Sequence, residues 1–375
     1  MGAVPKPATI FAHARLLPAA HRSMSAHPFL AGLRHSPDYL LQNLDLVNRR
    51  GLVVHINENI YRQASFLDER MFTPHTQGAW FPLERLFEAT RGLTVPRVPH
   101  YIFHTGHCGS TLISRLLGEL PRAFSLREPL TLLALAMMQR ELDMPGTALD
   151  GDAWRRLLHL SLQLLSRTYR KDDRPLIKLT SGAGNLAEML LARNRESRAV
   201  LLYLSLETWL ATMLRAEETR ENGRAYAAAW LADFHRLTGR TDIRQGTLND
   251  AQQFSLNWLT ELLCFKRTRD AAPGRTRLLD FETFLAAPAE QLEILADFLE
   301  LDAGRNQAEV LVNGPWMQCY AKIPSQRFDR EMRRRELDEA RQRLAAEIRA
   351  GLTWAESLCR ETPVLAPLAV HLHTH

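Results

Sequence analysis

The sequence contains little lysine, few cysteines and no long apolar run. Lysine occurs at only five of the 375 positions, so the 47 basic side chains are nearly all arginine, and a lysine inside a motif is conspicuous. The four cysteines lack the spacing of a zinc site or of a disulfide framework, which favours a reducing compartment and predicts a cytoplasmic protein. No apolar run of about 18 residues exists and the proline-containing N-terminus has no apolar core, so neither a membrane span nor a secretory signal is expected.

The composition is that of a globular protein with a sizeable core and a mildly basic surface. Hydrophobic residues make up 46% of the chain and charged residues 24%. The net charge of +5 suits an anionic small molecule and is too weak to predict nucleic-acid binding. Acidic residues interrupt the arginine-rich stretch 330–349, so we expect a solvated amphipathic helix there. No pattern indicates the oligomeric state.

Three regions are expected along the chain: an N-terminal extension (1–95) packed on the main domain, an α/β domain (96–325), and a C-terminal helix and tail (326–375). Within the extension the pattern predicts a helix over 39–47, a strand over 51–56 and a second helix over 59–71. The last residues, which include three histidines, are expected to be a disordered tail rather than a metal site.

From residue 100 onward, short apolar strands alternate with amphipathic helices, which predicts a three-layer α/β/α fold with a central parallel sheet. The strand Tyr101–Phe103 is expected at the centre, between the strands Leu176–Lys178 and Val200–Tyr203.

A glycine-containing turn follows the predicted central strand and leads into an amphipathic helix. Glycines let backbone amides converge, and a helix N-terminus presents unpaired N–H groups, so this turn predicts an anion site. Two hydroxyl groups add donors. The residues expected at the anion are Gly106, His107, Cys108, Gly109, Ser110 and Thr111.

The anion is not that of a kinase-type P-loop, because Ser110 stands where GxxxxGK[ST] has its lysine. The run Cys108-Gly109-Ser110-Thr111 instead resembles the 5′-phosphosulfate loop of sulfotransferases, in which a small residue and Gly-Ser-Thr or Gly-Thr-Thr follow Lys or Arg. His107 replaces that basic residue, and a histidine is fully charged only below its pKa.

Four more stretches resemble the same family, in the family's order, so that the resemblance spans about residues 98–301. They are Arg127-Glu128-Pro129, Arg174–Leu179, Ser197–Arg215 and Arg277–Leu301. The resemblance implies a P-loop NTPase-like sulfotransferase fold, 3′-phosphoadenylyl sulfate as donor, no metal, and a small-molecule or glycan acceptor. One departure stands out: Leu204 lies where the family has the arginine that holds the 3′-phosphate, eight residues before the serine that is here Thr212. Arg215, one turn beyond Thr212, is a candidate to compensate.

The resemblance also implies roles for three side chains. Glu128 would be the general base, and the alternative is an ion pair with Arg127 or Arg115. His107 would contact the 5′-phosphate or the bridging oxygen, or else be a neutral histidine satisfied by backbone groups. Lys178 would neutralise the transferring group, or else reach solvent from a strand end.

Two further positions have a binding role and a simpler alternative. Thr212 would bind the 3′-phosphate, or else bond to its own helix backbone. Tyr320 and Lys322 would close over the donor, or else be solvated surface.

Three other functions remain open. Leu278-Leu279-Asp280 ends an apolar strand with an acid, as in a magnesium-dependent nucleotide-triphosphate enzyme. His107-Cys108 begins like the His-Cys-x5-Arg signature of cysteine phosphatases, but Arg115 arrives one position late. The third alternative is a non-catalytic nucleotide-binding member of the same fold, which the missing arginine and the histidine at 107 favour.

Overall fold

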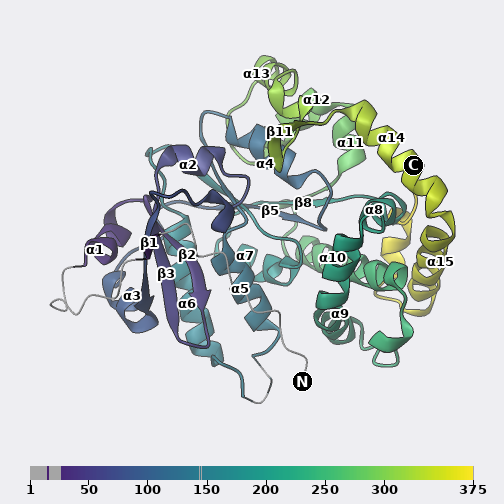
Figure 1. The fold of residues 1–375 in the computed structure, drawn as a ribbon, viewed down its shortest axis with the longest axis horizontal. Coiled ribbons are helices and arrows are strands. Elements are labelled where there is room, and N and C mark those ends of the chain that lie inside the picture. The colour runs from purple at the N-terminus through teal and green to yellow at the C-terminus, as the bar shows by residue number, and fades with distance from the viewer. Residues whose placement is uncertain (1–14, 17–26, 143, 145, 375) are drawn as a thin grey trace. The chain divides into compact units, whose positions relative to one another are not determined.

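The computed structural model describes residues 15–16, 27–142, 144 and 146–374 (Figure 1). Its main sheet has five strands in the order β6-β7-β5-β8-β9, and the pairs β6–β7, β5–β8 and β8–β9 are parallel. The strands are β5 (His100–His104), β6 (Ala123–Arg127), β7 (Arg174–Lys178), β8 (Ala199–Tyr203) and β9 (Thr276–Asp280). The predicted parallel α/β sheet is thus confirmed, with β5 in the middle.

The chain divides into two compact units. Unit 1 comprises residues 1–99 and 122–178, and unit 2 comprises residues 100–121 and 179–375. The region boundaries expected after residues 95 and 325 stay a prediction.

Unit 1 contains a second sheet, which the sequence reading missed. Its strand order is β1-β4-β3-β2, with β1 (Arg15–Leu16), β2 (Tyr39–Asp45), β3 (Arg50–His55) and β4 (Gln77–Pro82). The helix predicted over 39–47 is wrong, because this segment pairs antiparallel with β3. Leu40, Leu41 and Leu44 fit a helical period, but pairing with β3 determines the conformation. The predicted strand over 51–56 is confirmed by β3.

The helix predicted over 59–71 is also longer than the observed one. Only α2 (Glu58–Gln63) is α-helical, and a 3₁₀ turn at Glu69–Met71 follows. The other helices of unit 1 are α1 (Pro28–His35), α3 (Leu83–Ala89), α5 (Leu130–Gln139) and α6 (Gly151–Leu165). Helices α5 and α6 pack against β2. Arg167, just after α6, is buried and donates to the carbonyls of Leu33, Ser36 and Tyr39, which fixes the start of the second sheet.

Unit 2 is organised around α10 (Asp250–Ala271), whose residues from Phe254 to Phe265 are buried on every side. Such a helix belongs in the middle of a core, and α7, α8, α9 and α15 all pack on it (Figure 1). The other helices are α4 (Ser110–Gly118), α7 (Ala187–Arg193), α8 (Leu206–Met213), α9 (Glu217–Thr238), α11 (Phe281–Ala286), α12 (Pro288–Phe298), α13 (Arg305–Val312), α14 (Arg330–Arg343) and α15 (Ala345–Glu361). A hairpin of β10 (Cys319–Tyr320) and β11 (Ile323–Arg327) precedes α14.

The C-terminal end is ordered, so the expectation of a disordered tail is wrong over the described residues. A 3₁₀ helix runs over Ala366–His371, Leu368 is buried, and the ring Nδ1 of His371 lies 2.8 Å from the hydroxyl of Tyr203. His375 lies outside the described residues. Within the described ranges, no helix has the length and apolar character needed to cross a membrane.

Candidate functional site

The turn between β5 and α4 has an unusual backbone. Gly106, His107 and Gly109 have φ angles of 86°, 51° and 72°. Glycine adopts this left-handed region without a steric penalty, whereas for His107 the same region is strained. Since strained backbone clusters at ligand clamps, the turn is the first candidate for a binding site in unit 2.

The same turn leaves donors without acceptors. Helix α4 begins at Ser110 with Gly109 as N-cap, and no side chain caps it. Within the described residues, the amides of Gly109, Ser110, Thr111 and Leu112 have no hydrogen-bond acceptor. The hydroxyl of Thr111 is also without a partner there, although Thr111 is only 4% exposed. Unpaired amides at a helix N-terminus beside a buried hydroxyl are what an oxyanion requires.

Two buried side chains hold the turn in place through hydrogen bonds. The indole Nε1 of Trp209, on α8, donates to the carbonyl of Gly106 at 2.8 Å. The Sγ of Cys108 donates to the carbonyl of Leu202 in β8 at 3.5 Å. Trp209 and Cys108 are both fully buried, so the turn is held by core side chains.

Gly109 is required for packing as well as for its φ angle. A Cβ at this position would lie 2.1 Å from the ring of Phe281, at the start of α11. The ring of Phe281 thus occupies the space that a side chain at position 109 would need. In turn, Phe281 stacks on Phe284 and lies under the guanidinium of Arg333, which pairs with Glu282.

Glu128 and Lys178, in unit 1, form an ion pair. The Nζ of Lys178 contacts Oε1 of Glu128, and the backbone amide of Glu128 donates to the carbonyl of Lys178 at 2.7 Å. The Lys178 side chain is 0% exposed and that of Glu128 16%. The alternative in which Lys178 reaches solvent is therefore wrong, and Glu128 pairs with the lysine predicted to act beside it.

Arg127 instead fixes a segment that the sequence reading had not linked to the site. Its guanidinium donates to the carbonyls of Tyr61, Arg62 and Ala64 at 2.5–2.9 Å. The amide of Leu67 donates back to the Arg127 carbonyl at 2.7 Å. The segment 61–71 thereby covers the end of β6, where Phe66 lies 5.7 Å from Nζ of Lys178. These contacts join residues that are far apart in the sequence, so no local sequence pattern predicts that the segment 61–71 covers the end of β6.

In the segment that resembles a 3′-phosphate site, the side chains predicted to bind the phosphate are engaged within the protein. The hydroxyl of Thr212 donates to the carbonyl of Thr208 at 2.9 Å, which is the simpler of the two readings of that residue. Arg215 forms an ion pair with Glu336 of α14. Leu204 is fully buried, and its carbonyl accepts from Trp258.

The start of α8 is covered by the C-terminal segment and by α14. The amide of Glu207 donates to the carbonyl of Leu372 at 3.0 Å, and the hydroxyl of Thr374 lies within 3.2 Å of those of Ser205 and Thr208. Arg341 donates to Thr208 at 3.0 Å. An arginine does reach this helix, therefore, and it comes from the C-terminal region rather than from position 204.

The hairpin β10–β11 is attached to α4 through Arg115. This arginine is 2% exposed, donates to the carbonyl of Ala321 at 2.9 Å, and lies 4.2 Å from the ring centroid of Trp316. Burial lowers its pKa. Tyr320 and Lys322 are half-buried in this hairpin. Their closure over a donor stays a prediction.

The predicted site residues fall into the two units. Unit 2 contains the turn with its exposed His107, as well as Thr212 and Arg215, whereas unit 1 contains Glu128 and Lys178. That Glu128 and His107 face one cavity stays a prediction.

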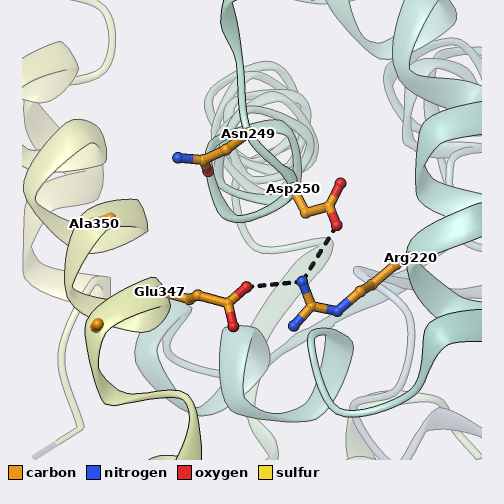
Figure 2. A pocket seen from close by; sticks show the side chains of 6 residues that line it. Arg220, Asn249, Asp250, Glu347 and Ala350 are labelled. Carbon is orange, nitrogen blue, oxygen red and sulfur yellow. Dashed lines mark hydrogen bonds and ion pairs between the residues drawn. The ribbon is translucent and has the colours of Figure 1, made fainter.

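A pocket of about 480 Å³ elsewhere in unit 2 has its charges already paired (Figure 2). Arg220 lies 3.2 Å from Asp250 and 2.8 Å from Glu347, and Arg224 lies 2.7 Å from Asp250. Hydrogen bonds from Arg224 and Arg220 lower the pKa of Asp250. This network joins α9, α10 and α15, and we assign it a structural role.

Two of the competing chemistries find little support in the geometry. The thiol of Cys108 is buried and donates a hydrogen bond, which does not suit a phosphatase nucleophile. The carboxylate of Asp280 accepts from the amide of Glu282 at 2.9 Å and so caps α11. Among the described residues, no group of three His, Cys, Asp or Glu side chains could hold a metal.

No protein-family model and no curated protein matches the chain. Among solved structures, the sulfotransferase domain from the curacin biosynthetic pathway is 16% identical, with a TM-score of 0.38, over 66% of this chain and 98% of that one. The sulfotransferase domain from the Synechococcus PCC 7002 olefin synthase is 14% identical, with a TM-score of 0.38, over 70% of this chain and 95% of that one. A sulfotransferase from Alicyclobacillus acidocaldarius is 13% identical, with a TM-score of 0.35, over the same shares.

Proposed function

We propose that this chain is a sulfotransferase that moves a sulfuryl group from 3′-phosphoadenylyl sulfate to a hydroxyl or amine of an acceptor. One observation carries the proposal: the four successive amides from Gly109 to Leu112, which lack acceptors among the described residues, lie beside the unpartnered hydroxyl of Thr111. This arrangement supports binding of a phosphate or sulfate. The motif Cys108-Gly109-Ser110-Thr111 narrows the ligand to the 5′-phosphosulfate of the donor.

The proposed reaction needs charge stabilisation more than covalent chemistry by the protein. The acceptor atom attacks sulfur, and the bond between sulfur and the bridging oxygen breaks. Its electron pair leaves with the phosphate, whose charge the amides of the turn and His107 stabilise. Glu128 takes the proton of the acceptor as the new bond forms, and Lys178 orients Glu128 and offsets the charge of the sulfuryl group.

This chain would bind the 3′-phosphate of the donor with residues other than the arginine that sulfotransferases use. Leu204 supplies no charge, and Thr212 and Arg215 are engaged within the protein. We therefore expect the turn to contribute most of the donor affinity. A comparison of 3′-phosphoadenosine 5′-phosphate with AMP measures what the 3′-phosphate adds.

A second function has its own support: nucleotide binding without transfer. Glu128 already pairs with the buried Lys178, so its carboxylate is engaged within the protein, as in an ion pair with a structural role. Binding of 3′-phosphoadenosine 5′-phosphate without turnover would show this function.

A transfer assay separates these functions. The protein is incubated with 3′-phosphoadenylyl sulfate and a panel of phenols, alcohols and amines, and released 3′-phosphoadenosine 5′-phosphate is measured by chromatography. A parallel reaction with ATP and magnesium tests the nucleotide-triphosphate alternative. Acceptor-dependent release supports a sulfotransferase. Hydrolysis of ATP without such release would contradict the proposal.

A further inference from the structure

A second cavity in unit 2 has an apolar interior and a charged rim. Its volume is about 240 Å³, and it lies between α10, β9 and the 3₁₀ helix Ala366–His371. The apolar lining comes from Leu262, Phe265, Leu278, Pro367 and Leu368. An apolar interior with a few polar groups is typical of small-molecule sites.

One charge at this rim is not balanced. Lys266 pairs with Asp270 at 2.6 Å, and His371 is bonded to Tyr203. The guanidinium of Arg269, by contrast, has no hydrogen bond or ion pair with any part of the chain that the structure describes. In the larger pocket, shown in Figure 2, Arg220 is instead paired with the carboxylates of both Asp250 and Glu347. The smaller cavity therefore offers a free cation and the larger one does not.

The field of Arg269 acts on Tyr203 together with that of Asp280, which does not line the cavity. Burial, followed by the field of Asp280, raises the pKa of Tyr203 to about 12, so its hydroxyl stays neutral at physiological pH. The carboxylate of Asp270 is already matched by Lys266. Among the charged residues that line the cavity, Arg269 is therefore a cation without a counter-charge, which favours a monoanion.

The size of the cavity limits what that anion can be. A cavity of about 150 Å³ holds one benzene ring. About 240 Å³ leaves room for such a ring with a carboxylate attached, but not for a nucleotide. Carboxylates are also the anions that a guanidinium binds in a two-pronged manner.

We propose that this cavity binds a small apolar monocarboxylate of about the size of benzoate. Its apolar body lies against Phe265, Leu278 and Leu368, and its carboxylate is held by Arg269. The cavity shares no residue with the turn at Gly106–Thr111 or with Glu128 and Lys178, so this site stands independently of the proposed function.

The test is a ligand-observed NMR titration of the full chain with sodium benzoate and, separately, with benzyl alcohol, its neutral analogue. Benzoate should bind at least about tenfold more tightly than benzyl alcohol, because a hydrogen bond to a charged group typically contributes that much. In a separate protein-observed spectrum, the ring resonances of His371, which lines the cavity, should shift on addition of benzoate.

Two variants and one control identify the site. Arg269→Gln should weaken benzoate binding about 10- to 100-fold and leave that of benzyl alcohol unchanged. Leu278→Phe narrows the cavity and should weaken both. Arg267→Gln removes an exposed arginine from the same helix that does not line the cavity, and should change neither. Absence of benzoate binding at millimolar concentration, equal binding of the two probes, or an unchanged affinity in Arg269→Gln would each overturn the proposal.

Discussion

The indole nitrogen of Trp209 lies 2.8 Å from the carbonyl oxygen of Gly106, so α8 holds the turn in which we place the donor phosphate. Trp209→Phe removes this hydrogen bond and keeps an aromatic ring in the core. The affinity for 3′-phosphoadenosine 5′-phosphate should then fall about 3- to 10-fold, because the turn loses the partner that sets its backbone. Isothermal titration calorimetry measures the change.

Trp258→Phe is the matched control. Trp258 is also fully buried on a unit 2 helix, and its indole donates to the carbonyl of Leu204 at 2.9 Å. Both variants should be destabilised by similar amounts, but only Trp209→Phe should lose affinity. Equal losses of affinity would mean that the bond to Gly106 has no specific role.

Gly109 provides a test of close packing in the turn. Gly109→Ala forces a residue with a φ of 72° to carry a Cβ, and it drives that Cβ into the Phe281 ring. The free energy of unfolding should fall by about 1–3 kcal/mol from strain and by a further 1–3 kcal/mol from the clash. Gly92→Ala separates the two, because Gly92 has a φ of 76° and open space around it. If both variants lose the same amount in urea denaturation, the Phe281 contact contributes nothing.

Glu128→Gln tests the proposed base. The turnover rate should fall by about 10²- to 10⁴-fold, because glutamine cannot take the acceptor proton, while donor affinity stays nearly constant. The variant also leaves the ammonium of Lys178 buried without a counter-ion, which typically costs about 3–5 kcal/mol of stability.

A second variant keeps the two effects apart. Glu128→Gln combined with Lys178→Met removes the uncompensated charge and should regain much of the stability without regaining the rate. Transfer at the parental rate by Glu128→Gln would show that Glu128 is structural and that the base lies elsewhere.

The network in Figure 2 predicts a pH dependence of stability. Arg224 and Arg220 lower the pKa of Asp250, so its stabilising effect is complete above the unfolded pKa and is lost as pH falls through the folded one. Asp250→Asn should cost about 1–2 kcal/mol at neutral pH, and this difference from the parent should shrink below about pH 4. Urea denaturation between pH 7 and pH 3 measures it. Asp152→Asn, at an exposed position, should change nothing, and a difference for Asp250→Asn that grew on acidification would contradict the account.

The parallel sheet could be predicted because its strands are continuous apolar runs between helices of clear period. Ala199–Tyr203 is such a run, and all five of its residues are buried. The segment Tyr39–Asp45 was mistaken for a helix because its leucines fit either structure, and only its pairing with Arg50–His55 decides. The hydrogen bond between His371 and Tyr203 likewise joins residues 168 positions apart.

In the candidate site, too, local features could be predicted from the sequence, whereas contacts between distant residues could not. Glycine spacing before an amphipathic helix was enough to predict the turn at Gly106–Thr111, because its geometry is local. The pair Glu128–Lys178 was predicted residue by residue but not as a pair, since the contact spans 50 positions and joins two strand ends. The bond between Trp209 and Gly106 had no sequence signal, because tryptophan in an apolar helix usually serves packing alone.

The central claim is that the amides of Gly109–Leu112 and the hydroxyl of Thr111 bind the phosphate of a donor nucleotide. Calorimetric titration with 3′-phosphoadenosine 5′-phosphate tests it, using the parent, Thr111→Val and Thr131→Val. Both threonine hydroxyls are buried without a hydrogen-bond partner among the described residues, so neither change should impair folding. We predict that the parent binds, that Thr111→Val binds about 10- to 100-fold more weakly, and that Thr131→Val, altered in α5, binds as the parent does. No binding to the parent, or an unchanged affinity in Thr111→Val, would contradict the claim.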